Sequence, residues 1–123
     1  MKPYISGQIT GLTWDEYSDN FARAEAWALE NDMQPVNPLK VVACPTEDCN
    51  PEETREHPAG GYLHHWRCYM KYDLIQMLEE CDSILMLPNY MNSAGSNIEL
   101  YVSREIGFKV MYLNKTYDGT YSD

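Results

Sequence analysis

Residues 82–88 read Asp-Ser-Ile-Leu-Met-Leu-Pro, and this stretch decides the class of fold. Its apolar run is continuous from Ile84 to Leu87, without alternation between polar and apolar side chains. Such a run, ended here by Pro88, is typical of a strand that is buried on both faces of a parallel sheet. Parallel neighbours are joined by long crossovers that usually contain a helix. We therefore expect a helix on each side of this strand.

Helical patterns flank the apolar run on both sides. A helix is expected from about residue 62 to residue 80, and another from about residue 94 to residue 106, with Gly107 as its C-terminal cap. The helix before the run would face the core with an apolar stripe made of Leu63, Trp66, Met70, Leu74 and Met77. Earlier in the chain, Thr13 and Glu16 form a capping-box pattern that opens a helix running to about residue 31. The inward face of that helix is expected to hold Phe21, Ala24, Ala28 and Leu29.

Three further short runs predict strands, at residues 3–6, 33–36 and 109–113. The resulting order predicts a single α/β domain over residues 1–113, in which a parallel sheet carries helices on both faces. A long acidic loop over residues 37–61 interrupts this domain, and a polar tail over residues 114–123 follows it. Ligands of such folds bind at the carboxyl ends of the strands, so the segments that leave those ends are the candidate site.

Composition narrows the class of protein and its partners. The chain has 123 residues, of which 44% are hydrophobic and 23% are charged, as expected of one globular domain. Nine basic and 19 acidic residues give a net charge of −10, which argues against a nucleic acid polymer as partner. No run of about 18 apolar residues is present, so no membrane is expected as partner. The first residues do not have the apolar segment of a signal peptide, which favours the cytoplasm.

Two carboxylates are candidates for catalysis. Glu99 comes early in the helix over residues 94–106, where the helix dipole would favour its ionised form, and an ionised carboxylate can act as a nucleophile. Residues 96–99 also match a capping box, which is a structural alternative for Glu99. Asp73 falls at the margin of the apolar stripe, where partial burial would raise its pKa and let it deliver a proton to a leaving group. Its alternative is a hydrogen-bonded residue at the rim of the core.

Two turns of small residues are candidates for ligand contact. Residues 6–11 follow the first strand and contain two glycines, so their backbone could approach a sugar or phosphate closely. Residues 93–96 lead into a helix N-terminus, which can hold an anion, although ordinary helix capping accounts for them equally well. A metal is not expected, because no paired C-x-x-C pattern occurs among Cys44, Cys49, His57, His64, His65 and Cys68.

These motifs, taken in order, resemble a known superfamily. They are residues 4–11 (Tyr-Ile-Ser-Gly-Gln-Ile-Thr-Gly), Asp73, the pair Cys81 and Asp82 before the apolar strand, and the pattern Ser93-x-Gly95-x-x-x-Glu99. The ordered set resembles the nucleoside 2-deoxyribosyltransferase-like superfamily, which includes the 2'-deoxynucleoside 5'-monophosphate N-glycosidases. The match runs from Tyr4 to Leu113, apart from the long loop.

The resemblance implies a flavodoxin-like or Rossmann-like sheet and a homo-oligomer, and we expect no cofactor. Glu99 would be the nucleophile at the anomeric carbon, Tyr4 would orient its carboxylate, and Asp73 would help to protonate the departing base. The substrate-binding residues around the sugar and base would be Ser6, Gly7, Ile9 and Gly11. Transferases that act on free nucleosides have an aspartate at the position of Ser93, whereas a serine at the helix start, with Gly95, favours a 5'-monophosphate.

Cleavage of an N-glycosidic bond needs one ionised and one protonated carboxyl group, as in retaining glycosidases. The resemblance therefore predicts an N-glycosidase or a deoxyribosyltransferase that acts on a nucleoside or a (deoxy)nucleoside 5'-monophosphate. The reaction would pass through a covalent glycosyl-enzyme intermediate and end in hydrolysis or in base transfer. Two alternatives stay open: a non-catalytic nucleotide-binding or sensing module, and an interaction protein whose acidic loop over residues 44–56 docks a partner. A pure binder has no need for a carboxylate at the anomeric carbon, so Glu99 is the discriminating residue.

Overall fold

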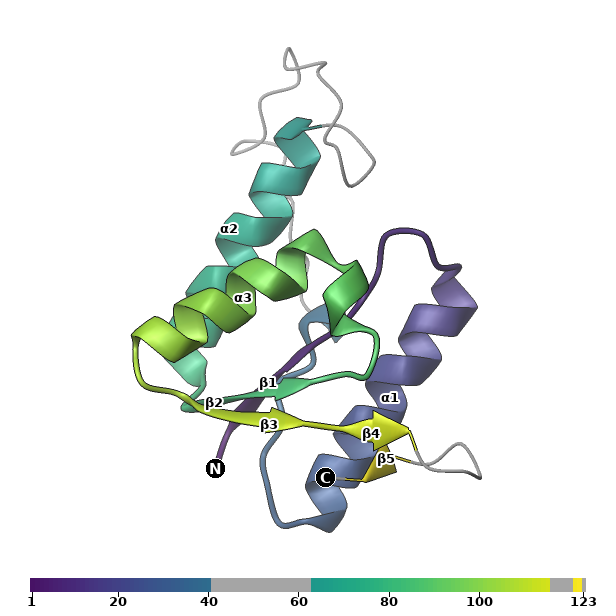
Figure 1. The fold of residues 1–123 in the computed structure, drawn as a ribbon, viewed down its shortest axis with the longest axis vertical. Helices are drawn as coiled ribbons and strands as arrows, with labels where there is room; N and C mark the ends of the chain where they lie inside the picture. The colour runs from purple at the N-terminus through teal and green to yellow at the C-terminus, as the bar shows by residue number, and fades with distance from the viewer. Residues whose placement is uncertain (41–62, 116–120, 123) are drawn as a thin grey trace.

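A small parallel sheet forms the centre of the fold. The computed structural model describes residues 1–40, 63–115 and 121–122. Strands β1 (Pro3–Ser6), β2 (Ser83–Met86) and β3 (Lys109–Tyr112) lie in the order β1-β2-β3, and both neighbouring pairs are parallel (Figure 1). The strand predicted from the apolar run is confirmed as β2, the central strand, and all of its residues are buried. The arrangement is consistent with a Rossmann-like unit, although the sheet has only three strands in the described part of the chain.

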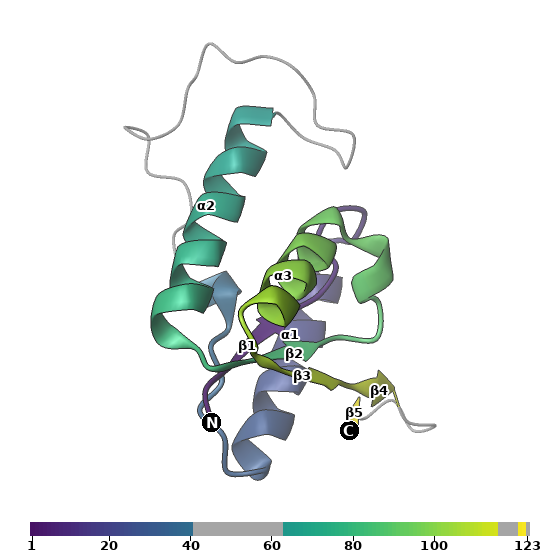
Figure 2. The same ribbon diagram turned by 60° about the vertical axis from the view of Figure 1, so that its left-hand side comes forward.

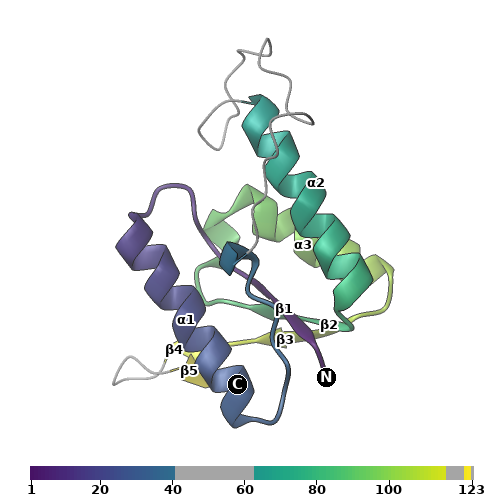
Figure 3. The same cartoon turned by 180° about the vertical axis from the view of Figure 1, so that it is seen from behind.

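Helices cover both faces of this sheet, as predicted. Helix α1 (Trp14–Glu30) packs on one face, while α2 (Leu63–Glu80) and α3 (Ala94–Glu105) lie on the other (Figure 1, Figure 2). Figure 3 views the same layers from behind. Each helix lies where its sequence pattern predicted it, with ends that differ by no more than a residue.

Local capping signals fix the ends of two helices. The Thr13 side chain accepts a hydrogen bond from the Glu16 backbone N–H, and the Glu16 carboxylate accepts one from the Thr13 N–H, so the predicted capping box of α1 is confirmed. At the end of α3, Gly107 has a φ of +82°, and the N–H of Phe108 donates to the carbonyl of Ser103 at 2.9 Å. Gly107 is therefore the predicted C-terminal cap, because a left-handed residue is easiest for glycine.

Side chains alternate along the strands, so each face of the sheet has its own core. The core beneath α1 contains Ile5, Phe21, Ala24, Ala28, Leu85, Leu87, Met111 and Leu113. The core beneath α2 and α3 contains Tyr4, Met77, Ile84, Met86 and Leu100. Within the predicted stripe of α2, Met77 is fully buried and Leu74 packs against this second core. The prediction for Leu29 is wrong: it is 58% exposed, because the helical rotation of about 100° per residue carries it past Ala28 onto the flank of α1.

The strand predicted at residues 33–36 is wrong as a strand and is reduced to one parallel bridge between Val36 and Tyr4. Val36 donates to the carbonyl of Pro3 at 2.8 Å, and its own carbonyl accepts from Ile5 at 3.0 Å. The next bridge would need an N–H donor at Pro3, which proline does not have. The ladder therefore stops after one step, although Val36 lies along β1 as the pattern predicted.

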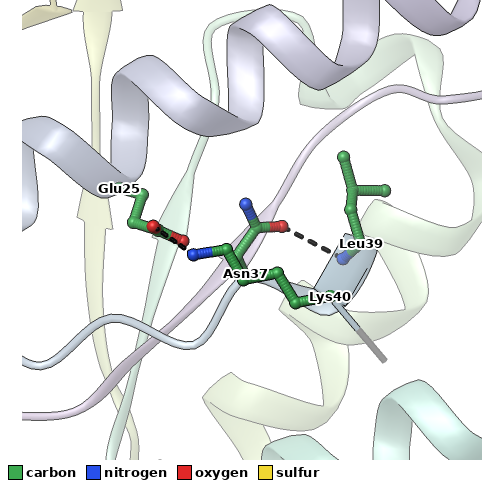
Figure 4. A network of polar contacts seen from close by, with 4 residues as sticks. All are labelled: Glu25, Asn37, Leu39 and Lys40. Carbon is green, nitrogen blue, oxygen red and sulfur yellow. Dashed lines mark hydrogen bonds and ion pairs between the residues drawn. The ribbon is translucent and has the colours of Figure 1, made fainter. Parts of the chain in front are cut away.

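Residues 37–40 hold the chain beside α1 as it leaves this bridge. The Asn37 side-chain oxygen accepts from the Leu39 N–H at 3.0 Å, and Lys40 Nζ lies 2.6 Å from Glu25 Oε1 on α1 (Figure 4). Lys40 is 67% exposed, so this ion pair contributes little to stability, about 0–1 kcal/mol. Most of the predicted acidic loop over residues 37–61 lies outside the described residues, which resume at residue 63.

The polar tail also contains more structure than its sequence predicted. Strand β4 (Asn114–Lys115) pairs antiparallel with β5 (Tyr121–Ser122), and β5 lies against α1. Both short strands fall within the predicted tail over residues 114–123, and the contact of β5 with α1 depends on packing that the polar sequence does not reveal. None of the helices in the described ranges is long and apolar enough to span a membrane.

Candidate active site

The site begins with two side chains of β1 that point toward α2 and α3. Tyr4 and Ser6 lie two residues apart, so both project from the same face of the strand. Both are buried, with 1% of each residue exposed. The local sequence thus presents two hydroxyl groups to the helices on this side of the sheet.

Glu99 of α3 meets both hydroxyl groups. Tyr4 Oη donates to Glu99 Oε2 at 2.8 Å, and Ser6 Oγ donates to Glu99 Oε1 at 2.7 Å. Glu99 is only 5% exposed, which is rare for a glutamate unless it has polar partners. Each carboxyl oxygen is therefore held by a separate hydroxyl donor, and the plane of the carboxyl group is fixed.

The N-terminus of α3 bears on two expectations for Glu99, the capping box over residues 96–99 and ionisation favoured by the helix dipole. Ser93 is the N-cap, and its side chain accepts from the Ser96 N–H at 3.1 Å. The capping box expected over residues 96–99 is therefore wrong, since Glu99 lies a full turn too far along the helix. The dipole argument is weakened for the same reason, because the field of a helix terminus falls off within the first turn.

Asp73 of α2 faces the same group of residues. It is partly buried, and burial raises its pKa to about 7, while the nearby Tyr4 hydroxyl acts in the opposite direction. Helices α2 and α3 approach closely one turn before these carboxyl groups: a Cβ atom added to Gly95 would lie 3.1 Å from Met70 Sδ. Met70 precedes Asp73 by three positions and Gly95 precedes Glu99 by four, so this contact lies about one helical turn before each of the two acidic residues.

The carboxyl groups influence each other and Tyr4. Burial raises the pKa of Glu99 to about 8, with a further rise from the charge of Asp73, while the hydrogen bonds from Ser6 and Tyr4 act to lower it. Burial and the neighbouring Glu99 also raise the pKa of Tyr4 well above its usual range, so its hydroxyl stays protonated. Burial thus favours the protonated form of Glu99, contrary to the expectation that this residue is readily ionised. Near neutral pH the pair retains one proton.

The turn after β1 is packed against the turn after β2. A Cβ on Gly7 would lie 2.3 Å from Leu87 Cδ1 and 2.9 Å from Leu87 Cβ, so only glycine allows this approach. The Gln8 N–H donates to Asn89 Oδ1 at 3.2 Å, which ties the two turns together. Gly11 has a φ of +90°, which accounts for glycine at that position, and Ile9 is 37% exposed beside it.

The structure thus brings together the predicted catalytic residues Tyr4, Asp73 and Glu99 around one point. It also adds two side chains to which the sequence assigned no catalytic role, Ser96 beside Ser6 and Asn89 between the turns. Ser96 precedes Glu99 by three positions, which puts both on one helical face, and this spacing was the available signal.

Only some of the cysteines and histidines considered as metal ligands lie within the described residues. In the described ranges, no group of three or more His, Cys, Asp or Glu residues could hold a metal ion. Cys44, Cys49 and His57 lie outside those ranges, as do the side chains of His64 and His65.

Fold and site together define a small α/β protein in which a buried glutamate and a partly buried aspartate lie on one side of a parallel sheet. Residues 1–112 match the model of the family described as a domain of unknown function, DUF4406, and the chain belongs to that family. Neither the curated proteins nor the solved structures contain a match to the chain.

Proposed function

We propose that this protein cleaves the N-glycosidic bond of a nucleoside or (deoxy)nucleoside 5'-monophosphate through a covalent glycosyl-enzyme intermediate. The observation that carries the proposal is the meeting of Tyr4, Asp73 and Glu99, from three separate elements, around one buried carboxylate. A purely structural glutamate at this depth would be costly, since an isoleucine or leucine there would need no polar partners. A nucleophilic carboxylate requires both the depth and the oriented hydrogen bonds.

The fold supports the resemblance from which this function was predicted. The Val36 bridge lies on the outer side of β1, which gives the order Val36, β1, β2, β3 across the sheet. That order corresponds to strands 2-1-3-4 of a flavodoxin-like sheet. The proposed site accordingly lies where such folds bind ligands, toward the carboxyl ends of β1 and β2.

In the first step, a Glu99 oxygen forms a bond to the anomeric carbon of the sugar. The bond from that carbon to the base nitrogen breaks, its electron pair goes to the base, and Asp73 supplies the proton that neutralises the departing base. Catalysis requires the one-proton form in which the proton lies on Asp73, although the higher pKa of Glu99 favours the opposite placement. In this reactive form the Tyr4 and Ser6 donors stabilise the anion on Glu99.

In the second step, an acceptor releases the sugar from Glu99. For hydrolysis, a water oxygen attacks the anomeric carbon, the ester bond to Glu99 breaks, and the water proton passes to the Asp73 carboxylate. A second base in place of water would give base transfer. The chemistry needs no cofactor, because Glu99 stabilises the positive charge that develops on the sugar and Asp73 neutralises the negative charge on the departing base.

The start of α3 is the proposed contact for a 5'-phosphate. Ser93 Oγ accepts from the Ser96 N–H, so its own proton remains available to donate to a phosphate oxygen. The backbone N–H groups of the first turn, at Ala94 and Gly95, add a positive end to the helix. An aspartate at position 93 would repel the same phosphate. We further propose that the protein works in the cytoplasm as a homo-oligomer.

The direct test is a mass-spectrometric screen for base loss. The protein is incubated with nucleosides and with ribo- and deoxyribonucleoside 5'-monophosphates, with and without an acceptor base. Release of free base is expected from the unaltered protein and from Glu105→Ala, an exposed acidic position of α3, but not from Glu99→Ala. If every substrate stays intact while a nucleotide binds tightly, the protein is a nucleotide-binding or sensing module.

A further inference from the structure

Two buried serines link β1 to α3 beside the candidate nucleophile. Ser6 is 1% exposed and Ser96 is 2% exposed. Their hydroxyl oxygens lie 2.9 Å apart, and Ser6 Oγ also lies 2.7 Å from Glu99 Oε1. Ser96 Oγ, Ser6 Oγ and Glu99 Oε1 therefore form one continuous row of buried, hydrogen-bonded oxygens.

Proton counting fixes the direction of these hydrogen bonds. A serine hydroxyl has one proton to donate and can accept as well. An ionised Glu99 accepts only, so Ser6 must give its proton to Oε1, and the contact with Ser96 then requires Ser96 to donate to Ser6. When Glu99 holds a proton on Oε1, both bonds can reverse direction. In that reversed state the Ser96 proton has no acceptor within the row, whereas an ionised Glu99 leaves both serine protons hydrogen-bonded, so the row favours the ionised carboxyl group.

The outer end of the row is anchored by the start of α3. The backbone N–H of Ser96 donates to Ser93 Oγ at 3.1 Å, which fixes Ser96 in the first turn. Ser96 and Glu99 then lie on one face of the helix, three positions apart. The N-cap interaction therefore holds Ser96 where its hydroxyl group contacts that of Ser6, and Ser6 in turn contacts the Glu99 carboxyl group.

We propose that Ser6 and Ser96 form a hydroxyl relay that positions the Glu99 carboxyl group and stabilises its ionised form for attack. This inference rests on the proposed function, and it makes both serines positioning residues that act through Glu99. In the described part of the chain, the titratable groups that face Glu99 are Tyr4 from β1 and Asp73 from α2, and Cys81 in turn faces Tyr4. Unlike Asp73, the two serines can be removed from this environment without changing any charge.

The test compares Ser6→Ala and Ser96→Ala with Ser103→Ala. Ser103 is also fully buried on α3, seven positions beyond Ser96, but it donates to Met77 Sδ at 3.6 Å and not to Glu99. Titration of ¹³C-labelled glutamate carboxyl groups by NMR reports Glu99 directly, with Glu99→Gln assigning its signal. Ser6→Ala should raise the Glu99 midpoint by about one pH unit, Ser96→Ala should raise it by less, and Ser103→Ala should leave it unchanged.

The rate of base release gives a second readout. Single-turnover release at neutral pH should fall roughly 10- to 100-fold in Ser6→Ala and less in Ser96→Ala, with the acidic side of the pH–rate profile moved to higher pH. Midpoints in both alanine variants equal to that of Ser103→Ala would overturn the relay, and Ser96→Ala decides the matter if Ser6→Ala fails to fold. Shifted midpoints in a protein that releases no base would support the relay and overturn the proposed function instead.

Discussion

Tyr4 and Glu99 are 95 positions apart in the chain, and the tyrosine hydroxyl donates a 2.8 Å hydrogen bond to the glutamate carboxyl group in a buried site. The bond connects β1 to α3 across the face of the sheet that α2 also covers. Because Asp73 faces the same point, the bond marks where three elements of the fold converge. The predictions below follow from this convergence and from the close packing that supports it.

Removal of the Tyr4 hydroxyl should impair catalysis more than folding. Tyr4→Phe keeps the buried ring but leaves Glu99 Oε2 without its donor, so single-turnover base release should fall roughly 10- to 100-fold, the cost of one hydrogen bond to a charged group. Tyr101→Phe, at a position that is 67% exposed on the same helix as Glu99, is the matched control and should keep full activity. Equal rates in the two variants would contradict the role assigned to Tyr4.

The rate of base release should show a narrow maximum between about pH 7 and pH 8. Burial raises the pKa of Asp73 to about 7 and that of Glu99 to about 8. Below this window both carboxyl groups are protonated and the nucleophile is lost, and above it both are ionised and the acid is lost. A pH profile of kcat/KM measures the two limbs, and Asp73→Asn should remove the decline on the alkaline side. A rate that is flat from pH 5 to pH 9 would exclude the pair as acid and nucleophile.

Stability should fall as the pH rises toward 8. The pKa values of Asp73 and Glu99 are raised by folding, so between about pH 4.5 and pH 8 the folded state holds protons that the unfolded state has released. The favourable contribution is complete at low pH and is lost as pH rises through the folded-state values. At pH 8.5, Glu99→Gln should therefore be more stable than the unaltered protein, by on the order of 1–2 kcal/mol.

Urea unfolding at a series of pH values checks this linkage. The slope of stability against pH should be shallower in Glu99→Gln, whereas Glu105→Gln, at an exposed position of α3, should follow the unaltered protein. Parallel curves for all three proteins would mean that the Glu99 carboxyl group is ionised without cost in the folded state.

Gly7→Ala should be more damaging than Gly107→Ala, although only Gly107 has a positive φ. The added Cβ at Gly7 would lie 2.9 Å from Leu87 Cβ, an atom fixed to its backbone, so the turn must shift at a cost of about 3 kcal/mol. At Gly107 nothing lies within 4 Å, and the cost is about 1 kcal/mol of backbone strain. Urea midpoints measure both losses, and a larger loss at Gly107 would contradict the close approach of the two turns.

Much of the fold could be predicted because its signals are local. The capping box at Thr13 and Glu16, the glycine cap at Gly107 and the apolar run of β2 each act within one element. The strand predicted around Val36 failed because its pairing depended on a donor that Pro3 does not have. That failure involves a partner distant in the chain, which periodicity within one segment does not report.

The sequence by itself determined the helices, the central strand and the acidic and hydroxyl residues available to a site, since each depends on side-chain pattern over a few neighbouring residues. Only the tertiary structure decided that Glu99 is 5% exposed, that Ser96 reaches Ser6, and that Asp73 raises the pKa of Glu99. Burial and electrostatic coupling depend on distances between elements, and those distances are set by how α2 and α3 pack on the sheet.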